Sequence, residues 1–448
     1  MIHTITNNRY LKYKTPLIEY IKNNNLYNGE NLIYTNKYTD GTFSITNPTS
    51  EYKNCDFVNG YPHFKIPLEI CLEEIYYFIN NQKIYDYQFN IRYGDTHPHK
   101  PIPKLAQVRN LIVENSLSSL IGDNVTSYYG FGDISIKSLN DFLNKNNINI
   151  SSEEIFKLVV NNHLSNELKD KLLAYNKESL FKIKEFLKHI NLPINEFTIE
   201  SSLYTNQDLY QKLKTDQRYK NELKENGELK YSLQELMFIY SLTKNENNIL
   251  INIIGANQSD HVLKVNEILR NSTPDINCRF LTYEICRNAD ERDYSKWINY
   301  FEQFIEVNNL NINGEKITAD ELLKIIVTIV SNDNILDFKN LNKYLKGVKV
   351  FCEEANKCNK FSNINNIDFN NNLLCKMSLV CYNLNRSIEK GEQNYFYKYV
   401  LGIIKEYEMN KEKYQGIEKL YYDFIRACFI RLGFSNLVDK ERCKVLIK

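Results

Sequence analysis

The segment that most constrains the fold runs from Gln88 to Gly122, where a short alternating stretch leads through a proline-rich loop into a helical pattern. Residues 88–93 alternate polar and apolar side chains, as a short β-strand does. The prolines at positions 98, 101 and 103 exclude a helix in the loop, and Pro103 is favoured as the first residue of the next helix. Because a strand that feeds a helix N-terminus presents free backbone N–H groups, this turn predicts an anion-binding site at the edge of a parallel sheet.

Length and composition limit the class of protein. The chain has 448 residues, of which 43% are hydrophobic, enough to fill the cores of two or three domains. There is no apolar run of about 18 residues and no N-terminal signal peptide, so we expect a cytoplasmic protein. The ten cysteines include no Cys-x-x-Cys pair, which favours reduced core thiols over a metal site. The net charge of +1 does not by itself indicate a polyanionic partner.

The start of the predicted helix resembles the first signature of class I arginyl-tRNA synthetases. Residues 100–110 read Lys-Pro-Ile-Pro-Lys-Leu-Ala-Gln-Val-Arg-Asn, where the family has Lys-Pro followed by His-Val-Gly-His-Leu-Arg-Ser, with one extra residue in the spacing. Lys100 and Arg109 match, whereas Lys104 and Gln107 stand at the two histidine positions. In the family these histidines steady the phosphates of ATP. The resemblance therefore implies an ATP site in which Lys104 offers a cation and Gln107 cannot act as an imidazole does.

Further stretches resemble the family in the same order along the chain. In the first three of the four stretches given below, most of the motif is kept but its aspartate is replaced, by Asn195, Glu235 and Asn257 in turn. The stretches are 194–204 (family Phe-Asp-x-x-x-x-Glu-x-Ser-Leu-Tyr), 231–236 (Tyr-Leu-Thr-x-Asp-Ile), 251–261 (Val-Gly-Ala-Asp-Gln/His) and the helical 395–433. The order across about residues 85–435 makes coincidence a poor explanation.

The resemblance assigns roles to particular residues. Carboxylates pair with ammonium and guanidinium groups, so the implied ligand of Glu200 and Glu235 is an amino acid, with arginine favoured. A solvated or capping role for these residues is the alternative. ATP with its accompanying Mg²⁺ is the implied cofactor, and no other metal is expected. A Lys-Met-Ser-Lys-Ser-type loop is expected at 308–318, which offers one lysine. The assigned residues are, for catalysis, Lys104, Gln107 and Lys316; for ATP, His97, Lys100, Arg109, Gly255, Ala256 and Gln258; for the amino acid, Glu200, Ser202, Tyr231 and Glu235.

The stretch from 395 to 407 interleaves aromatic and cationic side chains, a mixture that can stack unpaired bases and hold phosphates. Tyr395, Lys398, Tyr399 and Lys405 are its candidate tRNA contacts. The same stretch also forms an apolar helical stripe that a protein core would use, and both interpretations stay open from the residues alone. The resemblance favours tRNA.

The patterns and the resemblance together predict three parts. Residues 1–84 form a shortened α+β N-terminal module, and residues 85–335 an α/β, Rossmann-like class I synthetase domain with a helical insertion near 136–225. Residues 336–448 form an all-α, anticodon-binding-like domain. Because both ATP-handling elements depart from the family pattern, we expect a tRNA- or ligand-binding pseudo-synthetase; the alternative is an active, divergent arginine–tRNA ligase or an ATP-dependent biosynthetic amino-acid ligase. The sequence does not predict an oligomeric state.

Overall fold

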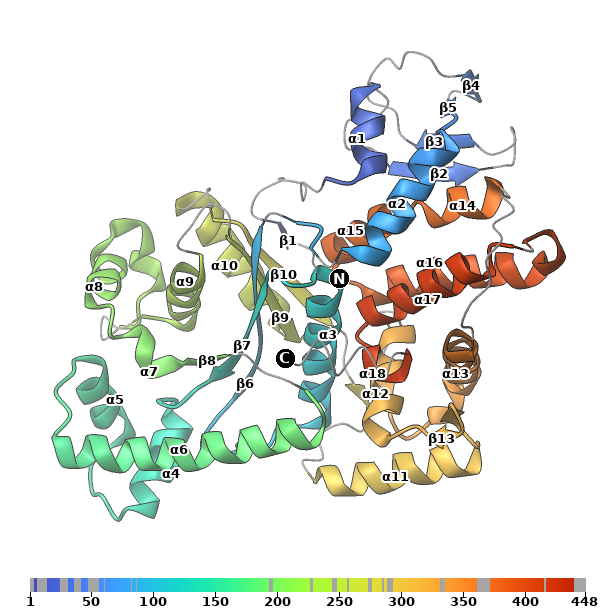
Figure 1. The fold of residues 1–448 in the computed structure, drawn as a ribbon. Coiled ribbons are helices and arrows are strands. Elements are labelled where there is room, and N and C mark those ends of the chain that lie inside the picture. The colour runs from blue at the N-terminus through green and yellow to red at the C-terminus, as the bar shows by residue number, and fades with distance from the viewer. Residues whose placement is uncertain are drawn as a thin grey trace.

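A central sheet divides the molecule, with helices on both faces and a smaller sheet at one end (Figure 1). These features belong to a computed structural model of the whole chain. It describes residues 4–5, 14–24, 31–35, 42–46, 56–59, 61–81, 83–85, 87–192, 196–225, 229–243, 248–255, 258–272, 276–283, 286–287, 293–330, 334, 336–360, 371–414 and 416–438.

The central sheet has six strands in the order β1-β10-β9-β6-β7-β8, all parallel except the edge strand β1. The chain moves outward from β6 through β7 to β8 and then returns to β9 on the other side of β6. This reversal between β6 and β9 defines a doubly wound, Rossmann-like sheet, whose ligand crevice lies at the carboxyl ends of these strands. The strands are β1 (Thr4–Ile5), β6 (Gln88–Thr96), β7 (Val125–Phe131), β8 (Glu196–Ile199), β9 (Asn248–Gly255) and β10 (Cys278–Tyr283).

Strand β9 shows how one strand supplies two cores. Ile249, Ile251 and Ile253 pack on the face covered by α3 (Leu105–Ile121), together with the helices that follow residue 319. Leu250 points to the opposite face, where α9 (Tyr231–Leu242) and α10 (Ser259–Ser272) cover the sheet. A strand covered on both faces needs an almost continuous apolar run, which is why β9 contains little polar sequence.

Helices with one strand connect β7 to β9, in the region where the sequence predicts an insertion. The first of these helices lie beside the sheet (Figure 1), and their core continues into the sheet through Leu250, Cys278 and Phe280. Within this stretch β8 joins the central sheet, so the segment is not wholly separate from it. The elements are α4 (Ile136–Lys145), α5 (Ser152–Val160), α6 (Asn166–His189), β8, α7 (Glu200–Leu203), α8 (Gln207–Thr215), the 3₁₀ turn η1 (Gln217–Glu222) and α9.

A small four-stranded antiparallel sheet, in the order β2-β3-β5-β4, forms the N-terminal module with α1 and α2. Helix α2 packs against the C-terminal helices α14 (Asn371–Met377), α15 (Val380–Lys390) and α17 (Glu418–Arg431). Strand β1 lies outside this module, since it pairs with β10 of the large sheet. The module's elements are α1 (Pro16–Asn23), β2 (Asn31–Thr35), β3 (Thr42–Thr46), β4 (Asp56–Val58), β5 (Tyr61–Phe64) and α2 (Leu68–Asn80).

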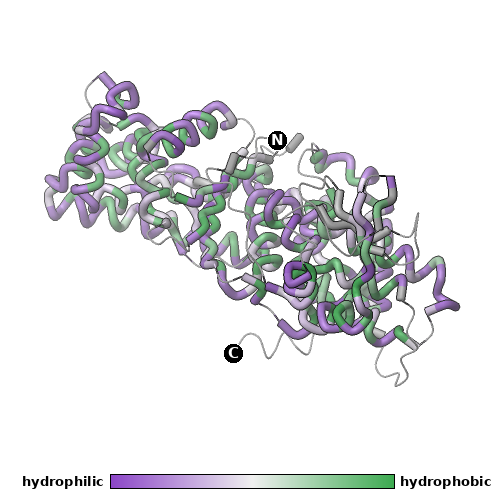
Figure 2. The backbone as a smooth tube through the Cα atoms, turned by 90° about the horizontal axis from the view of Figure 1, so that it is seen from above, coloured by the Kyte–Doolittle hydropathy of each residue, from purple (hydrophilic) through white to green (hydrophobic). Residues whose placement is uncertain are grey.

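The remainder of the chain is mainly helical and covers the α3 side of the sheet (Figure 1). Along the helices of the molecule hydrophobic and hydrophilic residues alternate, as they do in amphipathic helices with one face toward the core (Figure 2). None of the described helices combines the length and apolar character needed to cross a membrane. The elements are β11 (Cys286–Arg287), α11 (Tyr294–Val307), β12 (Asn311–Ile312), β13 (Glu315–Lys316), α12 (Ala319–Ile329), β14 (Leu336–Asp337), η3 (Leu341–Lys343), α13 (Leu345–Lys360), α14 (Asn371–Met377), α15 (Val380–Lys390), α16 (Gln393–Met409), η4 (Lys411–Tyr414), α17 (Glu418–Arg431) and α18 (Ser435–Val438).

Candidate functional site

Segments that follow β6, β7 and β8 meet at Gly132, the first residue after β7. His97, directly after β6, places its Nδ1 atom 3.2 Å from the carbonyl oxygen of Gly132. A Cβ atom on Gly132 would lie 2.4 Å from that Nδ1 and 3.4 Å from Oε2 of Glu200. His97 and Glu200 were both predicted from the sequence as ligand-contacting residues, and the fold brings them together over one glycine.

Asp133, the next residue, links the segments around Gly132 by hydrogen bonds. It is 2% exposed, and its carboxylate accepts hydrogen bonds from the backbone N–H of Ser201 at 2.8 Å and from Nδ2 of Asn176 at 3.3 Å. Burial raises the pKa of Asp133 to about 6, and the hydrogen bonds from Ser201 oppose that rise. The carboxylate thereby joins the start of α7, which carries Glu200, to helix α6.

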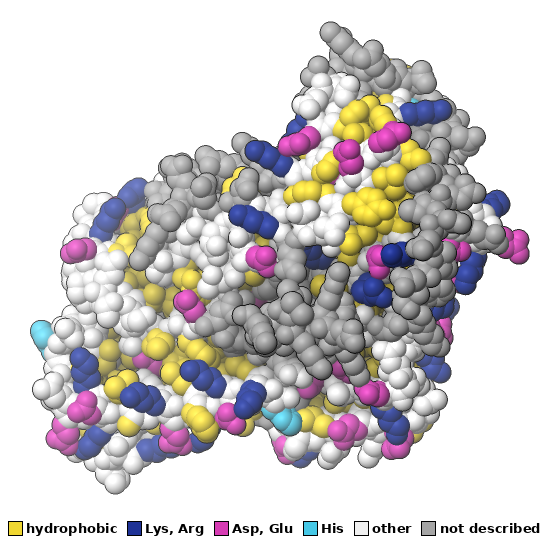
Figure 3. All heavy atoms as spheres, in the orientation of Figure 1, with side chains coloured by type: hydrophobic (Ala, Val, Ile, Leu, Met, Phe, Trp, Pro, Cys, Tyr) yellow, Lys and Arg dark blue, Asp and Glu magenta, His cyan; other side chains and the backbone are white. Residues whose placement is uncertain are grey.

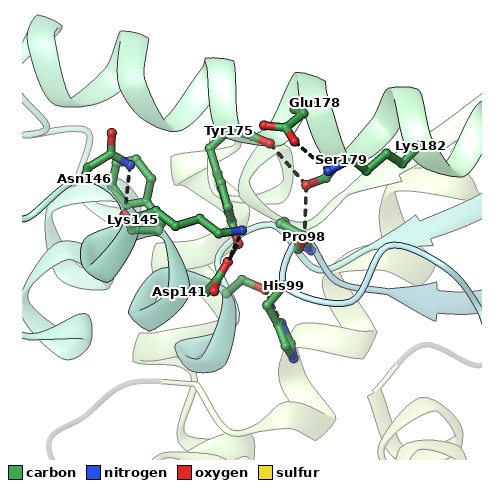
Figure 4. Close-up of polar contacts among 11 residues, drawn as sticks. Pro98, His99, Asp141, Lys145, Asn146, Tyr175, Glu178, Ser179 and Lys182 are labelled. Carbon is green, nitrogen blue, oxygen red and sulfur yellow. Dashed lines mark hydrogen bonds and ion pairs between the residues drawn. The ribbon is translucent and has the colours of Figure 1, made fainter. Parts of the chain in front are cut away.

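The proline-rich loop after β6 is held by the helices of the insertion (Figure 4). The His99 ring stacks on the His97 ring at 5.4 Å between centroids, and its Nδ1 lies 3.1 Å from Oγ of Ser138. Burial, followed by the neighbouring His97, lowers the pKa of His99. From α6, Ser179 donates a hydrogen bond of 3.2 Å to the carbonyl oxygen of Pro98. The loop is thus a supported part of the structure, in contact with two helices.

Polar contacts also tie the two insertion helices to each other next to this loop (Figure 4). The hydroxyl of Tyr175 donates to Asp141 at 2.6 Å, and the Lys145 ammonium lies 2.8 Å from the same carboxylate. Along α6, lysines alternate with acidic residues and form ion pairs such as Lys171 with Glu167 and Lys182 with Glu178. Figure 3 shows the same mixture of signs along that edge. This face of α6 therefore presents no uniform positive field.

A second polar cluster lies on the α9 face of the sheet. Nη1 of Arg92 on β6 lies 2.8 and 3.0 Å from the two carboxylate oxygens of Glu235, and both side chains are about 5% exposed. Asn252 on β9 donates to the same carboxylate, and the Arg92 guanidinium lies 4.2 Å from the ring centre of Phe238. Glu235 was predicted to bind an amino acid, whereas here its partners come from the chain itself.

The start of α3 uses Gln107 as part of its own cap. The side-chain oxygen Oε1 of Gln107 accepts a hydrogen bond of 2.8 Å from the backbone N–H of Lys104. This is half of a capping box, in which the third helical residue reaches back to the N-cap. Lys104 is half-buried, and Lys100 is exposed in the preceding loop. Arg109 is 2% exposed, and its Nη2 donates to the carbonyl oxygen of Asn334 at 3.4 Å.

No family model and no curated protein sequence matches the chain. Solved structures do match. The arginyl-tRNA synthetase of Thermus thermophilus superposes with a TM-score of 0.62 at 11% identity, over 94% of this chain and 97% of that one. The arginyl-tRNA synthetase of Plasmodium falciparum gives a TM-score of 0.60 at 12% identity, over 96% and 98%. The fold is that of the arginyl-tRNA synthetases. The fold class predicted from the sequence is thereby confirmed.

Within this fold, the described residues predicted at the end of β9 lie at the crevice, whereas the predicted lysine lies on a separate hairpin. Gly255 ends β9 at the switch point, Gln258 is exposed just beyond it, and Ala256 lies outside the described residues. Lys316 stands on the hairpin β12–β13, which forms a two-stranded sheet apart from the central one. Its ammonium lies 2.9 Å from Oε1 of Glu306, and both side chains are exposed. The geometry does not group Lys316 with the residues around Gly132.

Two predicted amino-acid contacts, Ser202 and Tyr231, have partners within the chain. Ser202 is exposed, and its hydroxyl donates to the carbonyl oxygen of Ile199 at 2.6 Å. Tyr231 begins α9 and is 49% exposed, with its ring 4.5 Å from the ring of His261. Burial is the main cause that lowers the pKa of His261.

The candidate tRNA residues all lie on α16 but face in different directions. Lys398 and Lys405 are exposed, as a phosphate contact requires. The Lys390 ammonium lies 4.1 Å from the ring centre of Tyr395, a cation–π contact. The Tyr399 hydroxyl donates to the carbonyl oxygens of Lys376 and Met377 at 2.8 and 2.9 Å. Tyr399 thus anchors the end of α14, and the two lysines are the better candidates for contact with RNA.

Sequence reasoning missed Arg92, Gly132 and Asp133. For Gly132 and Asp133 a signal exists, because a Gly-Asp pair directly follows the strand-like residues 125–131, at the edge where parallel sheets place their ligands. For Arg92 the signal is a charged residue inside the predicted strand 88–93, because a charge that a sheet buries needs a partner. Its partner is 143 residues away in the sequence, and local patterns do not reveal it.

Proposed function

We propose that this protein is a pseudo-synthetase, which binds tRNA or a small ligand on an arginyl-tRNA synthetase scaffold without forming an aminoacyl adenylate. The observation that carries the proposal is the position of Gln107. It stands where the resemblance expects the second phosphate-steadying histidine, and its side-chain oxygen is bonded to the start of α3. The Gln107 oxygen thus occupies a backbone N–H at a helix N-terminus, where such groups can otherwise bind a phosphate.

The residues at the expected ATP site do not fit the nucleotide's triphosphate. Lys104 replaces the first histidine, Gln107 caps the helix, and Lys316 stands on a separate hairpin paired with Glu306. A single preorganised donor to the transition state is worth about 3 kcal/mol, or roughly a hundredfold in rate. The joint replacement of several donors supports a protein in which activation of an amino acid has been lost.

The exposed cations of α16 support tRNA as the partner. Lys398 and Lys405 lie on the solvent side of a helix whose opposite face is buried in the core. Phosphate contacts of this kind bind RNA without requiring an intact catalytic site. We therefore expect tRNA binding to persist where amino-acid activation does not.

The alternative function, a divergent arginine–tRNA ligase, draws on one observation. Lys100 is exposed and Lys104 half-buried in the loop that leads into α3, so two cations stand beside the crevice. If this alternative is correct, Lys104→Ala removes turnover and leaves the thermal unfolding temperature nearly unchanged. Unchanged turnover in that variant contradicts a role for Lys104 in the reaction.

The test combines ATP–pyrophosphate exchange with tRNA retention. We expect no exchange with any amino acid, with or without total tRNA, and a tRNA gel shift that weakens as salt rises. The charge-reversed double variant Lys398→Glu/Lys405→Glu should lose most of the shift. Lys171→Glu, an exposed lysine on α6, is the control and should keep it. Exchange with arginine overturns the proposal in favour of the ligase, and a missing gel shift removes tRNA as the partner.

A further inference from the structure

The ion pair between β6 and α9 has the composition of a guanidinium-binding site. Glu235 supplies a carboxylate whose two oxygens lie 2.8 and 3.0 Å from Nη1 of Arg92. Phe238, three residues later on α9, places its ring centre 4.2 Å from the guanidinium carbon. A carboxylate together with an aromatic face is the arrangement that recognises a planar cation.

We infer that Arg92 is a specificity-determining residue, which fills this guanidinium site from within the chain and excludes arginine as a ligand of the crevice. The inference deepens the proposed function, on which it rests, because it states which amino acid the scaffold does not bind. It also departs from the expectation that arginine is the favoured ligand of Glu235.

Burial makes the internal occupant hard to displace. The side chains of Arg92 and Glu235 are 5% and 4% exposed, so neither charge is compensated by water. Asn252 donates to Oε1 of the same carboxylate, which leaves little acceptor capacity for a further ligand. Removal of one member of such a buried pair leaves the other charge uncompensated, which is strongly unfavourable.

Charge repulsion opposes a second cation at this place. An arginine or lysine ligand would bring its positive group next to the Arg92 guanidinium, and like charges in a poorly hydrated site repel strongly. His261 lies close enough to this pair for the charges of Glu235 and Arg92 to act on its pKa. Its ring is 4.5 Å from that of Tyr231. The carboxylate of Glu235, which could offset a second positive charge, is already paired with Arg92.

The experiment removes the internal guanidinium and offers an external one. Wild-type protein, Arg92→Ala and Arg92→Ala/Glu235→Gln are compared by thermal unfolding with arginine, methylguanidinium or lysine at millimolar concentration. Wild-type protein should show the same unfolding temperature with arginine and with lysine. Arg92→Ala should unfold at a lower temperature and should be stabilised by methylguanidinium and arginine, with an affinity about tenfold higher than for lysine, the factor that about 1.4 kcal/mol provides.

The double variant is the matched control, because it has the same cavity without the carboxylate, and it should show no stabilisation by guanidinium compounds. A folded Arg92→Ala that gains nothing from methylguanidinium overturns the inference. If this variant does not fold at all, its refolding yield from urea with and without methylguanidinium becomes the measurement, and equal yields overturn the inference.

Equilibrium dialysis of wild-type protein against labelled arginine separates this inference from the proposed function. Arginine binding by the wild type that is lost in Glu235→Gln would overturn the role of Arg92. Without ATP–pyrophosphate exchange, that result would leave the proposed pseudo-synthetase intact. Exchange activity, by contrast, would overturn the proposed function itself.

Discussion

At Gly132 the chain has no room for a side chain, because a Cβ atom there would lie 2.4 Å from Nδ1 of His97. We expect Gly132→Ala to force the His97 ring out of place and to lower the free energy of unfolding by about 1–3 kcal/mol, the usual cost of overpacking. Urea denaturation measures this change. Gly402→Ala is the control, because Gly402 lies in α16 with nothing within 4 Å of the added atom, and it should instead gain about 0.5–1 kcal/mol. Equal stabilities of the two variants would contradict the contact.

Glu114 on α3 is a second residue with a measurable consequence. It is 2% exposed, and burial raises its pKa to about 7, against hydrogen bonds donated by Ser118 and Ser127. The folded state therefore holds a proton that the unfolded state releases between about pH 4.5 and 7. Stability from this group is present at low pH and is lost as the pH rises through that window.

We expect Glu114→Gln to flatten the fall in stability between pH 5 and 7, and to recover about 2–3 kcal/mol above pH 7. The serine hydroxyls can still bond to the amide oxygen, which keeps the local structure. Urea unfolding across pH values measures the slope. Part of the slope should remain, because burial also raises the pKa of Glu74 to about 7. Glu185→Gln, on the exposed side of α6, should leave the profile unchanged; a steeper profile in Glu114→Gln would contradict the assignment.

At the scale of the element, helix α3 depends on a cap that its own third residue provides. Gln107→Ala removes the acceptor for the Lys104 N–H, a contact of 2.8 Å, and should lower the free energy of unfolding by about 0.5–2 kcal/mol. Gln107→Glu keeps an acceptor oxygen at the positive end of the helix and should retain that stability. Chemical denaturation compares the two variants, and the tRNA gel shift should be the same in both. If both variants lose equal stability, the side-chain oxygen of Gln107 is not the cap.

Lys316, predicted as the lysine of a phosphate-binding loop, stands on a short hairpin. Asn313 and Gly314 both have positive φ angles, +57° and +80°, as the two-residue hairpin turn requires. The side chain of Asn356 on α13 contacts both Asn311 and Asn313. A short turn fixed to a neighbouring helix does not have the reach of a long phosphate-binding loop.

At the scale of the whole molecule, apolar side chains dock the N-terminal module on the C-terminal helices, and two thiols meet in this interface. The sulfur atoms of Cys71 on α2 and Cys375 on α14 lie 3.9 Å apart, and both residues are buried. We expect diamide, which takes two hydrogens from a pair of thiols, to produce an intramolecular disulfide between them. Peptide mass mapping without reductant detects the linked peptides.

Cys71→Ser should abolish that cross-link, whereas Cys278→Ser, which alters a buried thiol of the central sheet, should leave it intact. A disulfide between other cysteines, with none at Cys71, would contradict the docking of α2 on α14. The cross-link thus tests the relation between two parts of the chain that are 304 residues apart.

Local chemistry in the sequence predicted many of the elements. The strand, loop and helix between 88 and 121 form as expected. The caps of two other helices follow equally local spacing. Thr318 accepts from the N–H of Glu321 while Glu321 accepts from that of Thr318, and Ser151 accepts from the N–H of Glu154. These features depend on neighbours within four residues, which is why sequence spacing is sufficient to predict them. The Asn313-Gly314 turn had an equally local signal that was missed.

By itself the sequence determined local elements, such as the strand, loop and helix between 88 and 121, because hydrophobic periodicity and breaker residues act locally. The Rossmann-like class came from the resemblance of its motifs to a known family. Only the tertiary structure decided what the site residues contact. Arg92 and Glu235 meet because α9 covers the sheet face toward which Arg92 points, and His97 and Glu200 meet because β6 and β8 end at the same edge, separated by one strand. Such pairings depend on strand order and sheet face, which no short window of sequence contains.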